Sequence, residues 1–238
     1  MSLYIATAVI AYLLGSIPFG FILVRIFRGQ DVRQSGSGNI GATNVARSSP
    51  ALGALTLLLD ASKGYVAVRI SLHFAWQSAM TIPPGAHVEA LMGGSAAEFQ
   101  ARMHGALAGV GHIYFVGALA ALFAILGHMF PVWLRFRGGK GVATSIGALI
   151  PLAPRPLALA VAIFIVVVLV WRYVSLGSIV AAAAFPVLAY LMTAYHFSKG
   201  FMAIMFAIAA LIIFKHRENI GRLLEGTEPR FTIKRSRA

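Results

Sequence analysis

The sequence predicts an all-α, polytopic integral membrane protein with about seven transmembrane helices, whose polar cytoplasmic loops form the functional site. Two observations on composition support this: 59% of the residues are apolar and only 11% are charged, and the mean hydropathy is positive. The third observation is that long apolar runs recur along all 238 residues. Because the runs are regular, we expect one membrane-embedded domain over residues 1–238 and no separate soluble domain.

Apolar runs of roughly 17 to 25 residues are long enough to cross a bilayer as helices. The predicted spans are residues 3–25, 52–74, 105–126, 142–152, 156–174, 176–195 and 200–214. The fourth is short for a full crossing. Pro18 lies inside the first span, where it should kink or loosen the helix, since membrane helices tolerate proline when neighbouring groups satisfy the freed carbonyl.

The loops between these spans differ sharply in basic residues. Fifteen Lys and Arg residues fall on one side and four on the other, with Lys63 inside the second span. The positive-inside rule therefore predicts a cytoplasmic basic side, an external N-terminus and a cytoplasmic C-terminus. Residues 75–104 are expected to form an extended outer loop, and residues 215–238 a cytoplasmic tail.

Composition also excludes several kinds of site. The chain has no cysteine, so it has no disulfide framework and no thiolate nucleophile or metal ligand. Its formal charge of +13 suits topology and anionic headgroups better than nucleic acid. The acids on the basic side are only Asp31, Glu218, Glu225 and Glu228, too few for a carboxylate-rich metal site. We predict no metal and no cofactor.

The first chemically rich segment is "RQSGSGNIGATNVARSSP", residues 33–50. Glycine lets backbone N–H groups approach an anion, while Ser, Thr, Asn and Arg add donors and charge. Such a loop running into a helix is suited to phosphate. A flexible linker has the same composition, so this segment alone leaves both interpretations open.

Two further polar segments fall on the same predicted side. In residues 127–145, "FRGGKGV" places Lys140 among glycines at the start of a helix, where a lysine can meet a phosphate as a mobile point charge. The order of residues is not that of a Walker A loop. In residues 215–230, His216 and Asn219 share a face if the last helix continues past Phe214. "RYVSLGS", residues 172–178, lies beside them.

Asp60 and Lys63 are ionisable residues inside the second predicted span. Charges within a membrane are functional hypotheses by default. Their spacing of three residues favours a structural ion pair that steadies the bundle over a direct catalytic role.

Taken together, the chain resembles the bacterial PlsY family, membrane glycerol 3-phosphate acyltransferases that take their acyl group from acyl-phosphate. The motifs that carry the resemblance are, in order, "GSIPFG", "GSGNIGATNVAR", "LLLDASKG", "GHMFPVWLRFRGGKGVAT", "RYVSLGS" and "HRENIGRLLEGTE". The resemblance implies acyl transfer to the 1-hydroxyl of glycerol 3-phosphate, giving 1-acyl-glycerol 3-phosphate and phosphate. It also implies a multi-pass protein of the bacterial inner membrane, and that the donor's own phosphate helps to remove the hydroxyl proton.

The resemblance also implies roles for residues at the matching positions. The acyl-phosphate head would be held by Ser37, Gly38, Asn39, Thr43, Asn44 and Arg47, with Ser35 as a neighbouring candidate. The acceptor phosphate would be bound by Lys140, helped by Gly138, Gly139 and Gly141. The rest of the acceptor would be held by Ser178, His216 and Asn219, with Arg222 and Glu228 bracing the third segment. The catalytic set would be Ser37, Arg47, Lys140, His216 and Asn219.

Other functions fit the sequence less well. A small anion or phosphate transporter is the main alternative, but it should carry polar or broken helices near the middle of the membrane. An acyltransferase with a His-x4-Asp motif is disfavoured because none of the seven histidines is followed by Asp at that spacing. The expected partners are therefore acyl-phosphate, glycerol 3-phosphate and the lipid bilayer, without nucleic acid or metal.

Overall fold

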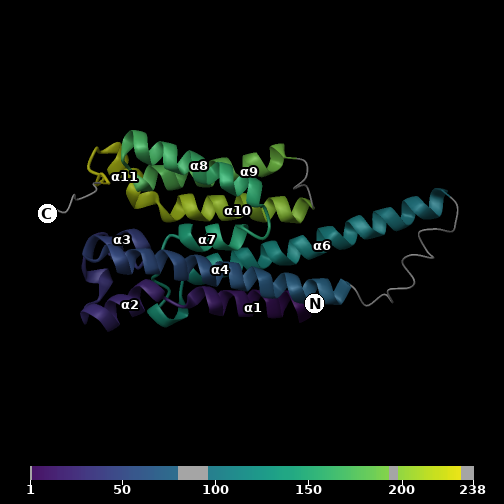
Figure 1. Cartoon of the computed structure of the whole chain (residues 1–238), viewed down its shortest axis with the longest axis horizontal. Helices are drawn as coiled ribbons and strands as arrows, with labels where there is room; N and C mark the ends of the chain where they lie inside the picture. Colours follow the sequence, from purple (N-terminus) through teal and green to yellow (C-terminus); the bar gives the residue numbers. More distant parts are fainter. Residues whose placement is uncertain (1, 80–95, 193–197, 232–238) are drawn as a thin grey trace.

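The computed structural model describes residues 2–79, 96–192 and 198–231, and within these ranges the regular structure is helical. The α-helices are α1 (Ser2–Ser16), α2 (Phe19–Arg28), α3 (Ala42–Ser48), α4 (Pro50–Ala79), α6 (Ala96–Met129), α7 (Val142–Leu149), α8 (Pro154–Trp171), α9 (Val174–Leu191), α10 (Lys199–Lys215) and α11 (Arg217–Leu224), with 3-10 turns η1 (Val32–Gln34) and η2 (Val132–Leu134). The long helices lie side by side in one bundle (Figure 1).

Among the described residues, five helical segments are long and apolar enough to cross a membrane, and a bent pair, α10 with α11, makes a sixth. These segments account for six of the about seven predicted spans, and the fourth is the one that lacks a helix of this length. Helix α7 has 8 residues, so at about 1.5 Å per residue the helix by itself is much shorter than a hydrocarbon core of roughly 30 Å. It packs beside α4 and leads into α8.

The first span is broken where Pro18 predicts it. Helix α1 ends at Ser16 and α2 begins at Phe19, so Ile17 and Pro18 interrupt the helical hydrogen bonding. The carbonyl oxygen of Ile17 accepts a hydrogen bond from Lys63 Nζ of α4 at 2.7 Å. The Phe19 amide also donates to this carbonyl, at 3.2 Å, so the buried lysine gives a carbonyl at the break a second hydrogen bond within the bilayer.

The expected outer loop over residues 75–104 is wrong at both ends. Helix α4 continues to Ala79 and α6 already begins at Ala96, and residues 80–95 between them lie outside the described residues. An apolar stretch that borders a span can extend a helix because the intrahelical hydrogen bonds remain satisfied. The weak apolar periodicity of this region concealed both extensions.

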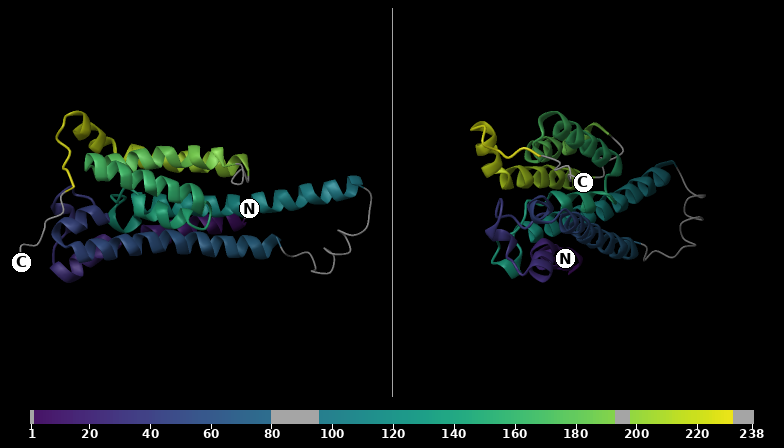
Figure 2. Two further views of the ribbon diagram at one scale, coloured as in Figure 1. Left: turned by 45° about the horizontal axis from the view of Figure 1, so that its top comes forward. Right: turned by 60° about the vertical axis from the view of Figure 1, so that its left-hand side comes forward.

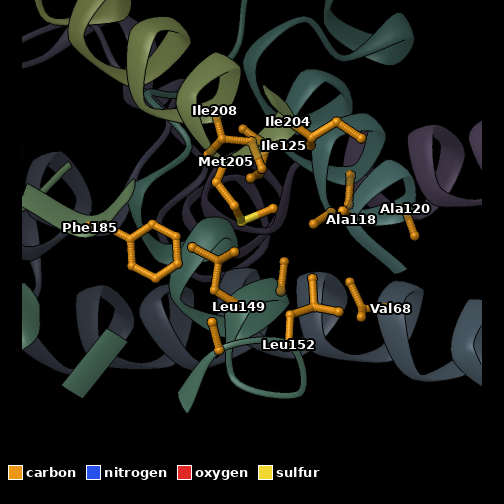
Figure 3. Packing of buried hydrophobic residues seen from close by; sticks show 14 of the residues in the cluster. Val68, Ala118, Ala120, Ile125, Leu149, Leu152, Phe185, Ile204, Met205 and Ile208 are labelled. Atoms are coloured by element: carbon orange, nitrogen blue, oxygen red, sulfur yellow. The ribbon is translucent and has the colours of Figure 1, made fainter. Parts of the chain in front are cut away.

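The core lies where α6 meets α1, α4 and α10. Ala118, Ala124 and Ile125 of α6 are fully buried, and Figure 3 shows Ile125 packed with Met205 and Ile208 of α10. Small residues let the backbones approach closely, as is common between helices in membranes. The outward faces of α8 and α9 remain strongly apolar, with Leu169 74% exposed, as expected for helices that face lipid.

The three polar segments gather at one end of the bundle. Figures 1 and 2 show α2, α3 and α11 together at this end, whereas the start of α1 lies away from it. The end of α8 joins them, since the Phe231 amide donates to the Arg172 carbonyl at 2.6 Å. We call this region, residues 29–41, 130–141, 172–173 and 216–231, the polar end.

Candidate active site

The first loop of the polar end is organised around the amide side chain of Asn44. Its Oδ1 accepts from the backbone amide of Ser37 at 2.8 Å, and its Nδ2 contacts the carbonyls of Val32, Ser35 and Asn39 at 3.1, 3.0 and 2.8 Å. Asn44 is 3% exposed, so it shapes the loop from within. Asn39 does the same locally, because its Oδ1 accepts from the Gly41 amide at 2.8 Å.

The other residues predicted to hold the donor form the outer surface of this loop. Ser35, Ser37, Gly38, Thr43 and Arg47 are all exposed. Gly38 has φ of +67°, a left-handed conformation that glycine adopts without strain. The loop therefore divides into asparagines that fix its shape and exposed groups that can face a ligand.

The second loop folds back against the end of α6. The amides of Gly138 and Gly139 donate to the carbonyls of Met129 and His128 at 3.2 and 3.0 Å. A Cβ atom on Gly139 would lie 2.0 Å from His128 Nε2, so the absence of a side chain is what permits this contact. Gly141, with φ of +83°, then begins α7. These glycines place the intervening Lys140.

Lys140 belongs to a hydrogen-bonded chain that crosses the polar end. Its Nζ donates to Asn219 Oδ1, and Asn219 Nδ2 donates to Glu228 Oε1 at 2.7 Å. The Glu228 carboxylate also accepts from Ser175 Oγ at 2.6 Å and from Arg222 Nε at 2.7 Å. Glu228 is thus the acceptor that ties the segment after α11 to α9 and, through Asn219, to Lys140.

Burial and neighbouring charges shift the pKa values of Lys140 and Glu228 in opposite directions. Burial lowers the pKa of Lys140, the Glu228 carboxylate raises it, and Arg222 and Arg47 lower it, with a net lowering. Burial raises the pKa of Glu228, but hydrogen bonds from Ser175, Asn219 and Arg222 lower it below its ordinary value. The carboxylate therefore stays ionised and helps to keep its lysine neighbour cationic.

His216 occupies the bend between α10 and α11, which meet at 56°. The last helix therefore does not continue straight past Phe214. His216 is 3% exposed, and its Nδ1 lies 2.8 Å from the Ile212 carbonyl. Burial lowers its pKa to about 4, a direction that the nearby Lys140 reinforces. The imidazole is accordingly neutral near pH 7, with Nδ1 as the donor to the carbonyl.

Ser178 is buried, but its hydroxyl donates to Val174, one turn earlier in α9, at 2.9 Å. That bond uses its proton and leaves its oxygen only as an acceptor. Ser175, which lies in the same motif and was not singled out from the sequence, reaches Glu228 instead. A serine spacing of three within a helix could have indicated both residues, since i and i+3 share a face.

A cavity of about 730 Å³ opens at the polar end. Its lining is basic and aromatic: Asp31, Arg33, Gln34, Gly38, Phe130, Phe136, Arg137, Gly138, Phe214, Lys215 and Arg217. Asp31 is paired with Arg33 at 2.6 Å, so the other cations dominate the charge. Of the residues predicted for the site, Gly38 and Gly138 line the cavity. None of its cations was among the residues assigned to the site from the sequence.

Sequence reasoning also missed His128, which is 3% exposed at the end of α6. The predicted third span ended at residue 126, so the rule that drew attention to Asp60 and Lys63, an ionisable side chain inside a span, did not reach His128. In the structure this span runs from Leu107 to Leu134 and includes it. Among the described residues, no group of three or more His, Cys, Asp or Glu residues could hold a metal ion. The chemistry available at the polar end consists of cations, hydrogen-bond donors, the Glu228 carboxylate that accepts from them and one neutral imidazole.

An apolar helical bundle with a buried Lys–Asn–Glu chain and a basic cavity at one end defines an integral membrane protein with a site for anionic, partly apolar ligands. The family model described as glycerol-3-phosphate acyltransferase matches residues 5–226. The chain belongs to this acyltransferase family.

Relatives and solved structures agree with this assignment. The chain is 42% identical over 225 residues to the glycerol-3-phosphate acyltransferase of Syntrophotalea carbinolica, covering 93% of this chain and 94% of that protein. It is 42% identical over 238 residues to that of Rhodopseudomonas palustris, covering 99% and 100%. The crystal structure of PlsY, an integral membrane glycerol 3-phosphate acyltransferase, in its glycerol 3-phosphate form superposes with a TM-score of 0.74 at 32% identity over 96% of each chain. The lysophosphatidic acid form gives 0.71 at 31% identity, over 96% of this chain and 95% of that one.

Proposed function

We propose that this protein transfers a fatty acyl group from acyl-phosphate to the 1-hydroxyl of glycerol 3-phosphate. The observation that carries the proposal is the chain from Lys140 through Asn219 to Glu228, which lies in a member of the glycerol-3-phosphate acyltransferase family. PlsY, the solved relative, has been crystallised in glycerol 3-phosphate and lysophosphatidic acid forms. An acceptor and a product of these classes suit the same basic end.

The proposed reaction needs no covalent enzyme intermediate. The 1-hydroxyl oxygen attacks the acyl carbonyl carbon, the bond from that carbon to the phosphate oxygen breaks, and inorganic phosphate leaves. The hydroxyl proton passes to the departing phosphate. Because acyl-phosphate is a mixed anhydride, its carbonyl is already activated, so positioning and charge stabilisation can supply most of the catalysis.

In this scheme Lys140 binds the acceptor phosphate as a point charge. Asn219 and the neutral His216 hold the acceptor through hydrogen bonds, and His216 lacks the proton that would make it a cation at neutral pH. Ser178 can only accept a hydrogen bond there. Arg222 and Glu228 brace this half of the site through their ion pair at 2.7 Å.

The donor half uses the first loop. Ser37, Thr43 and Arg47 provide exposed hydroxyl and guanidinium groups, while Asn39 and Asn44 hold the loop that presents them, with Ser35 as a neighbour. Gly38 and Gly138 both reach the basic, aromatic cavity. A cavity with cations and three phenylalanines suits a ligand that has both a phosphate and an apolar chain.

We further propose that the whole chain acts as one membrane domain, with its polar end in the cytoplasm, its N-terminus outside and its C-terminus inside, in a bacterial inner membrane. The excess of Lys and Arg at the polar end supports this orientation. The transporter alternative is set aside because the matched family is one of acyltransferases.

The decisive experiment supplies purified protein with glycerol 3-phosphate and one of three donors: acyl-phosphate, acyl-CoA or acyl carrier protein loaded with the same acyl group. We expect 1-acyl-glycerol 3-phosphate and inorganic phosphate only with acyl-phosphate. Product from acyl-CoA but not from acyl-phosphate would overturn the donor assignment, while absence of product from all three would overturn the proposed function.

Two sets of variants separate the two halves of the site. Lys140→Met should raise the KM for glycerol 3-phosphate by at least about 10-fold, because hydrogen bonds to charged groups contribute about 1.5–3 kcal/mol. Arg47→Ala and Ser37→Ala should instead raise the KM for acyl-phosphate. Arg28→Ala removes a cation of α2 that belongs to neither half and serves as the control. Wild-type kinetics in Lys140→Met would remove this lysine from the acceptor site.

A further inference from the structure

We propose that Asp60, Lys63 and His128 form a positioning centre within the bundle, which fixes the loop that carries Lys140 and ties it to the break in the first span. The three residues do not touch substrate in this proposal. They act through Lys140, so the kinetic test rests on the proposed function, whereas a second test of loop rigidity does not.

The three side chains form a compact buried cluster. Lys63 Nζ lies 2.9 Å from Asp60 Oδ1, and His128 Nδ1 lies 3.5 Å from the same oxygen, with every side chain 2–3% exposed. Asp60 and Lys63 thus form the ion pair that their spacing predicts, and His128 of α6 completes it. Removing one partner from a buried ion pair is strongly destabilising, because the charge left behind is uncompensated.

The loop that carries Lys140 packs against His128. Its carbonyl accepts from the Gly139 amide at 3.0 Å. A Cβ atom would come within 2.2 Å of this carbonyl oxygen from Gly138, and within 2.0 Å of Nε2 from Gly139. The loop therefore contacts both the backbone and the ring of His128. Asp60 faces the other ring nitrogen at 3.5 Å without a hydrogen bond between them, so in this proposal it orients the imidazole that the loop meets by electrostatic attraction.

Lys63 connects this cluster to the other half of the site. Its Nζ donates to the Ile17 carbonyl at 2.7 Å, at the break that leads through α2 into the first loop. One lysine thus contacts both the Asp60 carboxylate and the first span at its break before α2. In this proposal, Asp60, Lys63 and His128 together set the position of the first loop relative to the loop that carries Lys140.

Two unpartnered hydroxyls lie on the elements that surround the cluster. Ser16 Oγ and Thr144 Oγ1 are buried without a hydrogen-bond partner among the described residues. The Ser16 amide lies next to Gly127, and the Thr144 carbonyl lies next to Gly64, so both residues adjoin neighbours of the cluster. Buried polar atoms without partners are costly. Ser16 and Thr144 therefore extend the polar region around the charged cluster onto α1 and α7, within an otherwise apolar bundle.

The kinetic experiment compares His128→Ala with a matched histidine variant of the same helix. His112 of α6 is hydrogen-bonded to Tyr4 at 3.0 Å, near the opposite end of the bundle, so His112→Ala removes an equivalent side chain. We expect the KM for glycerol 3-phosphate to rise by about 10-fold or more in His128→Ala, since misplacement of a binding group by about 1 Å can cost roughly 10²-fold. The KM should stay at the wild-type value in His112→Ala.

Coupling to Lys140 distinguishes positioning from general damage. If His128 acts through Lys140, the double variant His128→Ala/Lys140→Met should have the same KM for glycerol 3-phosphate as Lys140→Met alone. His128→Asn should restore part of the lost affinity, because its amide nitrogen can face Asp60 in place of Nδ1. Additive effects in the double variant, or equal effects of His128→Ala and His112→Ala, would overturn the proposal.

Hydrogen exchange supplies a test that does not depend on turnover. The Gly139 amide, bonded to the His128 carbonyl, should exchange faster in Asp60→Asn and His128→Ala than in wild type, and not in His112→Ala. Unchanged exchange of the Gly139 amide would refute the positioning role, even if the protein transfers its acyl group to a substrate other than glycerol 3-phosphate. If Asp60→Asn and His128→Ala both fail to fold while His112→Ala folds, the cluster is an element of folding and the positioning proposal is wrong.

Discussion

The replacement of Gly139 by alanine offers a sensitive test of how the Lys140 loop is held. A methyl group there would lie 2.0 Å from His128 Nε2 and 2.8 Å from Cε1, where ordinary van der Waals contact begins at 3.4 Å. The loop or the ring must therefore shift by about 1.4 Å, and overpacking of this kind typically costs about 1–3 kcal/mol. The backbone of Gly139 has no positive φ, so the clash is the only cost.

The shift falls directly on the residue before Lys140. A displacement of about 1 Å in a positioned group can reduce activity by about 10²-fold, so we expect Gly139→Ala to raise the KM for glycerol 3-phosphate between about 10-fold and 100-fold. The KM for acyl-phosphate should change much less, because the Gly139 amide bonds to His128 and the three atoms nearest an added Cβ atom all belong to His128.

The assay measures phosphate release with one substrate varied and the other saturating, and uses two glycine controls. Gly109 of α6 and Gly221 of α11 have nothing within 4 Å of an added Cβ atom, so alanine at either position should leave both KM values unchanged. A wild-type KM for glycerol 3-phosphate in Gly139→Ala would show that the position of the loop does not govern binding of the acceptor, and would refute the reasoning.

Three further perturbations test other parts of the site. The pKa of His216 in the folded protein is about 4, so the unfolded chain binds a proton first as the pH falls below about 6.5. Stability should therefore fall between about pH 6.5 and pH 4 and level off below, by up to about 3 kcal/mol, and His216→Asn should remove this dependence in thermal melts at several pH values. Asn44→Ala should release the first loop and lower the efficiency with acyl-phosphate by at least about 10-fold, measured as kcat/KM, because each hydrogen bond contributes about 1 kcal/mol; an equal loss in a Ser48→Ala control, outside the loop, would contradict this. Glu228→Gln removes the carboxylate that raises the pKa of Lys140, so the alkaline limb of kcat/KM for glycerol 3-phosphate should move to lower pH; an unmoved limb would separate Glu228 from Lys140.

The helices and the clustering of polar segments could be predicted from the sequence because both depend on local composition. Runs of apolar residues must form helices in a bilayer, since only helices satisfy their own backbone groups. Pro18 predicts the break between α1 and α2 for an equally local reason. The exceptions were α7, whose helix is shorter than a full span, and the ends of α4 and α6, where periodicity was weak.

The roles of individual side chains were less predictable. The sequence places Asn44 and Ser37 in the same loop, but it does not say that Asn44 faces inward and accepts from the Ser37 amide. Likewise His216 and Asn219 are close in sequence, yet the bend between α10 and α11 directs His216 to the Ile212 carbonyl and Asn219 to Lys140. Such choices depend on contacts between segments far apart in the chain.

The sequence by itself therefore determined that this protein is a helical membrane protein whose glycine-rich and basic segments meet at one end of the bundle. Hydropathy and the satisfaction of backbone hydrogen bonds require that result whatever the helices pack against. Only the tertiary structure decided that Asp60, Lys63 and His128 meet, and that the loop carrying Lys140 rests on the last of them. Close packing of α4 against α6, which brings together residues almost seventy positions apart, is the physical reason.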